Sequence, residues 1–262
     1  MDRKEIALNN LIVKATVGST VHGTNLPDHS DNDEMGVCIE PPSHVVGLEN
    51  FENYVHRDKP DGVKSEAGDT DLSVYSLRKF VRLCLGGNPS ALVLLYVPDE
   101  FATVLEHYYW LPFKLNRHMF VSQRAGKAFL GYSLQQRLRM EGKLGRIGVH
   151  RPELEAEFGY DTKYAGHMLR LGYQGALYTL SGKIRLPMPK PQRERILDVR
   201  MGKVPLAAVL EEVEELEEVI RGRLKSLPPE GDYVKANRLL CETYFRWWNH
   251  SDTALEGMNL AL

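Results

Sequence analysis

The pattern of apolar and polar positions predicts β-strands in the first part of the chain. Residues 10–17 (NLIVKATV) form a β-branched run, and residues 34–39 (EMGVCI) form a second one that two prolines stop. Residues 71–75 alternate between apolar and polar and predict a third strand. This strand runs into a helix over about 76–85, which a Gly-Gly pair ends. Residues 45–56 fit neither pattern.

The second part of the chain is predicted to be helical. A short apolar segment over 90–96 is expected to be helical, and from about residue 115 onward the apolar residues recur with helical spacing, over 124–141, 164–178, 204–226 and 232–248. The sequence therefore predicts an α+β fold, in which a small mixed β-sheet flanked by helices precedes a helical domain. We place the first domain at residues 1–112 and the second at residues 113–262.

Composition narrows the class of protein. Of 262 residues, 43% are hydrophobic and 26% are charged, which is ordinary for a soluble globular protein. There is no apolar run of about 18 residues and no apolar stretch near the N-terminus, so we expect neither a membrane span nor a signal peptide. Cys38, Cys84 and Cys241 have no disulfide or zinc spacing. We expect all three to be buried, in a cytoplasmic protein with no membrane partner.

Charge is distributed unevenly along the chain. Residues 1–71 carry 14 Asp and Glu against 6 Lys and Arg, whereas residues 114–151 carry 9 Lys and Arg against Glu141 alone. An acidic segment beside a basic one suits an enzyme that holds cations at one place and polyanions next to them. A basic helix face that is merely solvated remains the alternative for the second segment.

The segment from Val17 to Val37 contains the candidate chemistry. Gly18 and Ser19 end the first strand, and a short helical turn should follow, with backbone N–H groups and a hydroxyl able to approach a phosphate. Asp31 and Asp33 are two residues apart, so in a strand both carboxylates project to the same side. Two like charges held together need a cation, and hard oxygen ligands select Mg²⁺ or Mn²⁺.

This acidic segment has two alternative interpretations. A solvated acidic loop over residues 28–34 stays open. A calcium loop would use Asp31, Asp33 and Gly36 at positions 1, 3 and 6. It fails because Met35 stands at position 5 and Pro42 stands where the bidentate glutamate belongs.

The segment resembles the Gly-Ser…Asp-x-Asp/Glu signature of the DNA polymerase β-like nucleotidyltransferase superfamily. More narrowly, the chain resembles the YcgL-like predicted nucleotidyltransferase family over most of its length. That likeness rests on YSLRKF (75–80), GNP (87–89), GYSLQ (131–135), GYDTKYAGHMLRL (159–171), GKIRLP (182–187) and VRMGK (199–203). One departure is Asn32, a polar residue where the family has an apolar one between the aspartates.

The resemblance implies further site residues. It implies a third carboxylate on a later strand, which is Asp71 by position, with Asp69 as the fallback. It also implies a basic helix that holds the triphosphate, and Lys163, His167 and Arg170 lie on one helix face at spacings of four and three. The alternative is that His167 is an ordinary interhelical histidine and the two cations lie at the surface. Weaker candidates are Arg200 and Lys203, and Arg78 and Lys79 are compatible with simple surface charges.

The expected function is that of the superfamily, a transferase that moves a nucleoside monophosphate from an NTP such as ATP to an acceptor hydroxyl and releases pyrophosphate. The three aspartates Asp31, Asp33 and Asp71 would hold Mg²⁺ or Mn²⁺. The nucleotide would contact Gly18, Ser19, Lys163, His167 and Arg170. The acceptor is left open among an RNA or DNA end, a protein and a small molecule. A nucleotide-binding or antitoxin-like regulatory protein without turnover is the alternative from another class.

Overall fold

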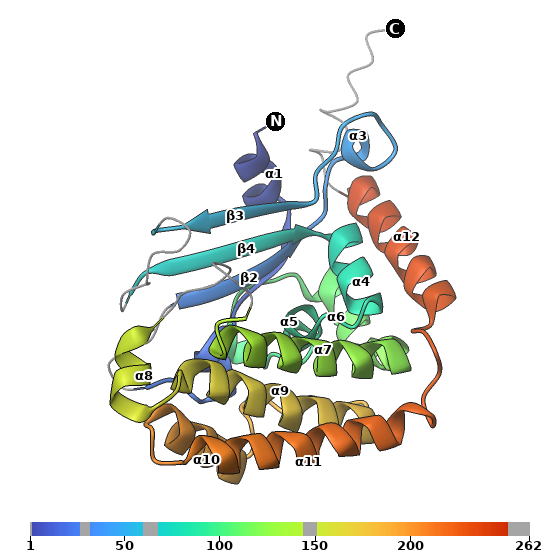
Figure 1. Cartoon of the computed structure of the whole chain (residues 1–262). Coiled ribbons are helices and arrows are strands. Elements are labelled where there is room, and N and C mark those ends of the chain that lie inside the picture. Colours follow the sequence, from blue (N-terminus) through green and yellow to red (C-terminus); the bar gives the residue numbers. More distant parts are fainter. Residues whose placement is uncertain (1, 27–31, 60–67, 144–150, 251–262) are drawn as a thin grey trace, which may run out of the picture.

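The computed structural model describes residues 2–26, 32–59, 68–143 and 151–250, and builds this part of the chain around a five-stranded sheet (Figure 1). The strand order is β3-β4-β2-β1-β5. Its strands are β1 (Leu11–Thr16), β2 (Asn32–Cys38), β3 (Asn53–Arg57), β4 (Thr70–Ser76) and β5 (Ala102–Leu105). β2 and β4 run parallel, and the other pairs are antiparallel. The predicted α+β class with a mixed sheet is confirmed.

The three predicted strands correspond to β1, β2 and β4, and two strands were not predicted. β3 falls in the segment that fitted neither pattern, because it is an edge strand with both of its faces partly open, and Val55 is 44% exposed. β5 has only four residues, of which none is fully buried. Short edge strands lack the buried face that makes alternation visible in a sequence.

The helices of the first part cover the sheet on both sides. They are α1 (Arg3–Asn9), α2 (Gly18–His22), α3 (Pro42–Val45), α4 (Leu77–Leu85), α5 (Pro89–Leu94) and α6 (His107–Leu115). The predicted helices over 76–85 and 90–96 correspond to α4 and α5. α4 begins where the Ser76 hydroxyl accepts a hydrogen bond from the Lys79 amide at 3.1 Å. α6 was not predicted, and Pro112 lies inside it.

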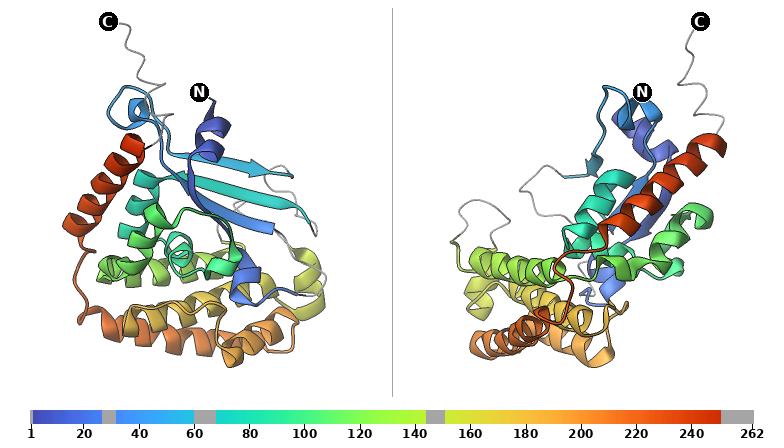
Figure 2. Two further views of the ribbon diagram at one scale, coloured as in Figure 1. Left: turned by 180° about the vertical axis from the view of Figure 1, so that it is seen from behind. Right: turned by 90° about the vertical axis from the view of Figure 1, so that its right-hand side faces the viewer.

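The later helices are α7 (Gln123–Met140), α8 (Pro152–Phe158), α9 (Thr162–Ser181), α10 (Lys190–Arg200), α11 (Leu206–Leu224) and α12 (Tyr233–His250). α7, α9 and α11 stack side by side on one side of the sheet (Figures 1 and 2). Close packing needs Gly175, where an added Cβ would lie 2.7 Å from Ile220 Cδ1 and 2.9 Å from Phe129 Cβ. Among the described residues, no helix combines the length and apolar character needed to cross a bilayer.

One apolar core runs from the sheet into these helices. It joins buried side chains such as Val37 of β2, Phe80 of α4, Phe129 of α7 and Ile220 of α11. α12 then returns along α4 and α6, as both views in Figure 2 show. The division at residues 112 and 113 stays a prediction, and the parts on either side of it share this core. Of the cysteines, Cys38 and Cys84 are buried as expected, whereas Cys241 is exposed on the outer face of α12.

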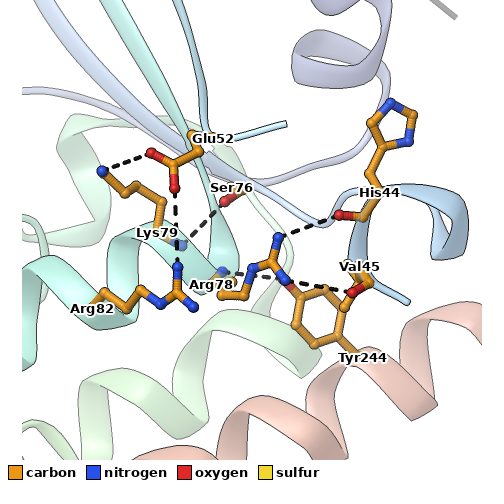
Figure 3. A network of polar contacts seen from close by, with 8 residues as sticks. All are labelled: His44, Val45, Glu52, Ser76, Arg78, Lys79, Arg82 and Tyr244. Atoms are coloured by element: carbon orange, nitrogen blue, oxygen red, sulfur yellow. Dashed lines mark hydrogen bonds and ion pairs between the residues drawn. The ribbon is translucent and has the colours of Figure 1, made fainter. Parts of the chain in front are cut away.

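A polar network links α12 to the start of α4 and to α3 (Figure 3). The Tyr244 hydroxyl of α12 accepts a hydrogen bond from the Arg78 amide at 3.1 Å. The Arg78 guanidinium donates to the carbonyl oxygens of His44, at 3.3 Å, and Val45, at 3.5 Å. Lys79 pairs with Glu52 at 2.8 Å. Arg78 is therefore not the simple surface charge that its place in the sequence suggested, because it holds the α3 segment against α4.

Glu40 lies under this network and gives a pH prediction. Its side chain is fully buried, and burial raises the pKa of its carboxyl, with smaller opposing effects from its own backbone amide, Tyr244, Arg78 and Ser76. A carboxyl with a raised folded-state pKa stabilises the fold below its unfolded pKa of about 4.3, and this stabilisation is lost as the pH rises through the folded value. We expect the free energy of unfolding to fall over that window.

Urea unfolding at a series of pH values, on wild type and on Glu40→Gln, measures this effect. The neutral amide should remove most of the decline, so the variant should gain on wild type as the pH rises. Glu218→Gln, on the exposed side of α11, is the control and should leave the pH dependence unchanged. Parallel pH curves for wild type and Glu40→Gln would show that the pKa of Glu40 is the same in the folded and unfolded states, and would contradict the raised pKa.

Candidate active site

The predicted site residues that the structure describes line one cleft of about 850 Å³ between the sheet and the helices. A smaller hollow of about 280 Å³ adjoins it and shares Asp33, Asp71 and Arg170 with it. The structure thus brings together residues that lie up to about 150 positions apart in the sequence. They are Gly18, Ser19, Asp33, Asp71, Lys163, His167 and Arg170. Asp31 lies outside the described residues.

The two aspartates are aligned by the parallel pairing of β2 with β4. Asp33 is the direct partner of Asp71 in this register, so both side chains project from the same face of the sheet. On β2, this face continues into buried Met35 and Val37, which pack in the core shared with the helices. The carboxylates therefore face the helical part of the molecule.

Asp71, and not Asp69, takes part in lining the cleft. Asp69 precedes the strand, where its carbonyl accepts a hydrogen bond from the Asn32 amide at 2.9 Å. Arg57 is the partner of Asp71 on the antiparallel strand β3, and its Nε lies 4.0 Å from Asp71 Oδ1. The side chains of Arg57 and Asp71 remain 47% and 38% exposed, so this pair is open to a ligand or to solvent.

The turn after β1 packs directly against the Asp33 carboxylate. Gly18 begins α2 with a φ of +66°, and an added Cβ would overlap Asp33 Oδ2 and lie 2.8 Å from its Cγ. The Val17 amide donates to the Asp33 carbonyl at 2.8 Å, which ties the end of β1 to β2. The predicted short helical turn is confirmed. Glycine is needed here both for the left-handed backbone and for the space that the carboxylate occupies.

α9 supplies the cationic wall. The Asp161 side chain caps this helix by accepting hydrogen bonds from the amides of Lys163, at 3.0 Å, and Tyr164, at 3.1 Å. Lys163, His167 and Arg170 then follow on the face that lines the cleft. Arg170 donates to Gln174 Oε1 at 2.9 Å. Burial lowers the pKa of Arg170 to about 10, against the raising effect of Asp33, so the guanidinium stays charged at neutral pH.

Two histidines beside these cations are held neutral. Burial lowers the pKa of His22 and of His167 well below the ordinary value, and the positive charge of Arg170 lowers both further. His22 Nε2 lies 3.2 Å from Arg170 Nη1, and as a neutral imidazole it can accept that hydrogen bond. His22 therefore orients Arg170 on the side of Asp33. The sequence did not single out His22, although it lies in the same segment as Gly18 and Asp33.

Other residues at the cleft were missed or ranked low. Arg200, a weaker candidate, lines the cleft and donates to the Thr24 carbonyl. Lys203 does not line it, and pairs with Asp198 at 3.1 Å. Arg139 and Arg151 line its far end. Their positions depend on how distant helices pack, so only the excess of basic residues over 114–151 pointed toward them.

The carboxylates of Asp33 and Asp71 fit a hard divalent cation. They are oxygen donors at the same level of adjacent strands, and such donors suit Mg²⁺ or Mn²⁺. Within the described ranges, no group of three or more His, Cys, Asp or Glu residues has the arrangement of a metal site. The third predicted ligand, Asp31, falls outside those ranges, so the fit rests on two carboxylates and on the space beside them.

A family comparison identifies the class of protein. A model of DNA polymerase β-type proteins matches residues 3–239, which places the chain among the polymerase β-like nucleotidyltransferases. The chain belongs to the RlaP family, described as the RNA repair pathway DNA polymerase beta family. The superfamily predicted from the sequence is confirmed.

Two individual proteins are also similar. An uncharacterized 38.9 kDa protein of Enterobacteria phage T4 is 27% identical over 146 residues, which is 55% of this chain. The match spans 43% of the length of that relative. A nucleotidyltransferase-like protein from Exiguobacterium sibiricum matches over 95% of this chain and 77% of its own, with 12% identity and a TM-score of 0.28. That TM-score is too low for positions to be compared between the two structures.

The contact between Gly18 and Asp33 can be tested by replacing Gly18 with alanine, which adds one methyl group. Gly18→Ala should destabilise the fold by at least about 1–2 kcal/mol, because alanine is strained in the left-handed region. It should also displace the Asp33 carboxylate and so weaken Mn²⁺ binding, measured by calorimetry. Gly159→Ala is the matched control, with a φ of +81° and open space around the added Cβ. It should show a similar backbone cost with unchanged Mn²⁺ binding. Equal Mn²⁺ affinity in both variants would contradict the proposed contact.

Proposed function

We propose that this protein is a divalent-metal-dependent nucleotidyltransferase. It moves a nucleoside monophosphate from an NTP to an acceptor hydroxyl and releases pyrophosphate. The observation that supports this proposal best is the alignment of Asp33 with Asp71 on one wall of a cleft whose other wall is formed by Lys163 and Arg170. Because the chain belongs to a polymerase β family, we interpret the carboxylates as metal ligands and the cations as residues that bind the triphosphate.

In this proposal the metal is held by Asp33 and Asp71, together with Asp31. When bound, Mg²⁺ or Mn²⁺ would neutralise phosphate charge and lower the pKa of the acceptor hydroxyl. Two carboxylates on a rigid pair of strands keep the donor oxygens in place before the substrate arrives, which reduces the reorganisation that the reaction requires.

The remaining residues would bind the triphosphate. Gly18 lets the backbone approach a phosphate closely, and the Ser19 hydroxyl adds a donor. Arg170 offers a planar guanidinium that His22 and Gln174 orient, and Lys163 adds a point charge. His167 lies between these cations and stays neutral, so it is suited to donating or accepting one hydrogen bond rather than to carrying charge. Catalysis would then come from positioning and charge neutralisation.

The family description supports a nucleic acid, and RNA in particular, as the acceptor. We therefore propose the hydroxyl of an RNA end as the group that receives the nucleotide, with ATP as the first donor to test. The narrower likeness to the YcgL-like family stays a prediction, because the matching family model carries a different description.

Metal binding by the carboxylates can be measured without a known acceptor. Asp33→Asn keeps the shape of the side chain and removes one of the aligned charges, so it should bind the metal more weakly. Wild type at 100 times its Kd for Mn²⁺ should gain about 2.7 kcal/mol, which is several degrees in Tm. The variant should lose most of this rise.

The control for this experiment is Asp99→Asn. Asp99 pairs with Lys114 at the surface, outside the cleft, and its loss should leave the Mn²⁺-dependent rise intact. If wild type shows no rise with Mn²⁺ or Mg²⁺, even with NTP present, the carboxylates do not hold a metal.

Transfer itself is tested with each labelled NTP, Mg²⁺ and total RNA. We expect wild type to label RNA and Lys163→Ala to raise the KM for NTP about 10- to 150-fold, the loss that one charge-assisted hydrogen bond of about 1.5–3 kcal/mol gives. Lys203→Ala, an exposed cation paired with Asp198, is the control and should leave the KM unchanged. Label in protein or in no acceptor, with NTP still bound, would favour the other acceptors or a protein without turnover.

A further inference from the structure

The basic segment 114–151 is mostly neutralised within the fold. Lys114 pairs with Asp99 at 2.5 Å, and Arg124 pairs with Glu230 at 3.2 Å. Arg117 lies over the Tyr96 ring, at 4.3 Å from its centroid. Arg137 and Lys143 both pair with Glu141, at 3.1 and 2.7 Å. Among the described cations of this segment, Arg139 and Arg151 are the ones that line the cleft.

These two arginines lie at the end of the cleft where α9 begins. α7 and α9 pack antiparallel, since an added Cβ on Gly126 would meet Thr179 and one on Gly175 would meet Phe129. The C-terminal end of α7, with Arg139, is therefore beside the N-terminal end of α9. From Arg170, near Asp33, to Lys163 is seven residues, or about 10.5 Å along the helix axis. In this register Arg139 is level with about residue 165 of α9, and Arg151 pairs with Asp161 at the start of the helix, so the two lie about one and a half and about two and a half helical turns from Arg170.

Arg139 presents a buried donor with no acceptor. Its Nε is buried and makes no hydrogen bond within the described part of the chain. Arg137, two residues earlier, has Glu141 at 3.1 Å and Glu214 at 3.6 Å. Buried guanidinium nitrogens are seldom left without a partner, and the partly exposed Arg139 side chain lines the cleft, so its guanidinium is available to an acceptor that enters the cleft. Because guanidinium groups pair bidentately with phosphate, phosphate is the ligand chemistry that fits.

Arg151 is anchored at the same end of the cleft as Arg139 by an ion pair and an aromatic contact. Its Nη1 lies 3.2 Å from Asp161 Oδ2, and its guanidinium lies 5.2 Å from the centroid of the Tyr164 ring. Glu153 and Glu157 line the same end of the cleft and oppose an anion. The cations Arg139, Arg151, Lys163 and Arg200 outnumber them along this wall.

We propose that Arg139, supported by Arg151, binds a backbone phosphate of the acceptor RNA strand. This inference rests on the proposed function for the identity of the acceptor. In the proposed function Ser19 and Arg170, close to Asp33, bind the triphosphate, and Arg139 lies further along α9, level with about residue 165. A strand whose terminal hydroxyl reaches the carboxylates would place a phosphate further along at this end.

Binding of a short single-stranded RNA, measured by fluorescence anisotropy in EDTA without NTP, tests the proposal. Arg139→Gln should weaken this binding about 10- to 150-fold, the effect of losing one charge-assisted contact. Its dependence on salt should also become shallower, by about 0.7 in the logarithmic slope, because one phosphate fewer is neutralised. The affinity for Mg²⁺-ATP should stay the same.

Arg137→Gln is the matched control, on the same helix two residues away but paired outside the cleft. It should bind RNA as wild type does, and melting temperatures of both variants check the fold. Unchanged RNA affinity in Arg139→Gln, an equal loss in Arg137→Gln, or a loss of ATP affinity in Arg139→Gln would each overturn the proposal. RNA binding is measured without turnover, so a failure of nucleotidyl transfer is seen separately from a failure of this site.

Discussion

The parallel pairing of β2 with β4 is the constraint on which the site depends. It sets Asp33 opposite Asp71, and a slip of one residue would turn one of these carboxylates to the other face of the sheet. Apolar side chains buried on both faces of the sheet fix this register. Leu72 and Val74 of β4 are buried with α1 on one side, whereas Val37 of β2 is buried with the helices on the other. The carboxylates are therefore positioned by apolar residues further along the same strands.

The cations of α9 form the other wall of the cleft, opposite the carboxylates. Arg170 is partly buried yet charged, because Asp33 offsets part of the cost of burial and because His22 and Gln174 provide polar partners. The histidines on either side stay neutral first because burial lowers the pKa of each, and second because the positive charge of Arg170 lowers it further. The cleft thus holds opposite charges apart on two rigid elements. Such a separation suits a ligand that carries both a cation and a polyanion.

Much of the fold and of the candidate site could be predicted from the sequence, because the elements concerned leave patterns among residues that are close together in the chain. Strands β1, β2 and β4 each bury one face or more, so their apolar residues form visible patterns, and the face of α9 follows from helical spacing alone. Edge strand β3 has no such signal. Arg57 becomes a neighbour of Asp71 only through an antiparallel ladder, and His22 meets Arg170 across 148 positions. Cys241 was wrongly expected to be buried, because residue type alone does not tell which face of α12 it occupies.

The basic segment shows the limit of counting charges. Nine cations against one anion suggested a surface for a polyanion, but the count does not include acids elsewhere in the chain that return to pair with them. Asp99 and Glu230 each neutralise one of these cations from outside the segment. An ion pair that is already satisfied offers little to a phosphate, whereas a guanidinium that lines the cleft without an acceptor can gain a hydrogen bond when one arrives. The affinity for a polyanion is therefore expected to come from the few cations whose partners the fold does not supply.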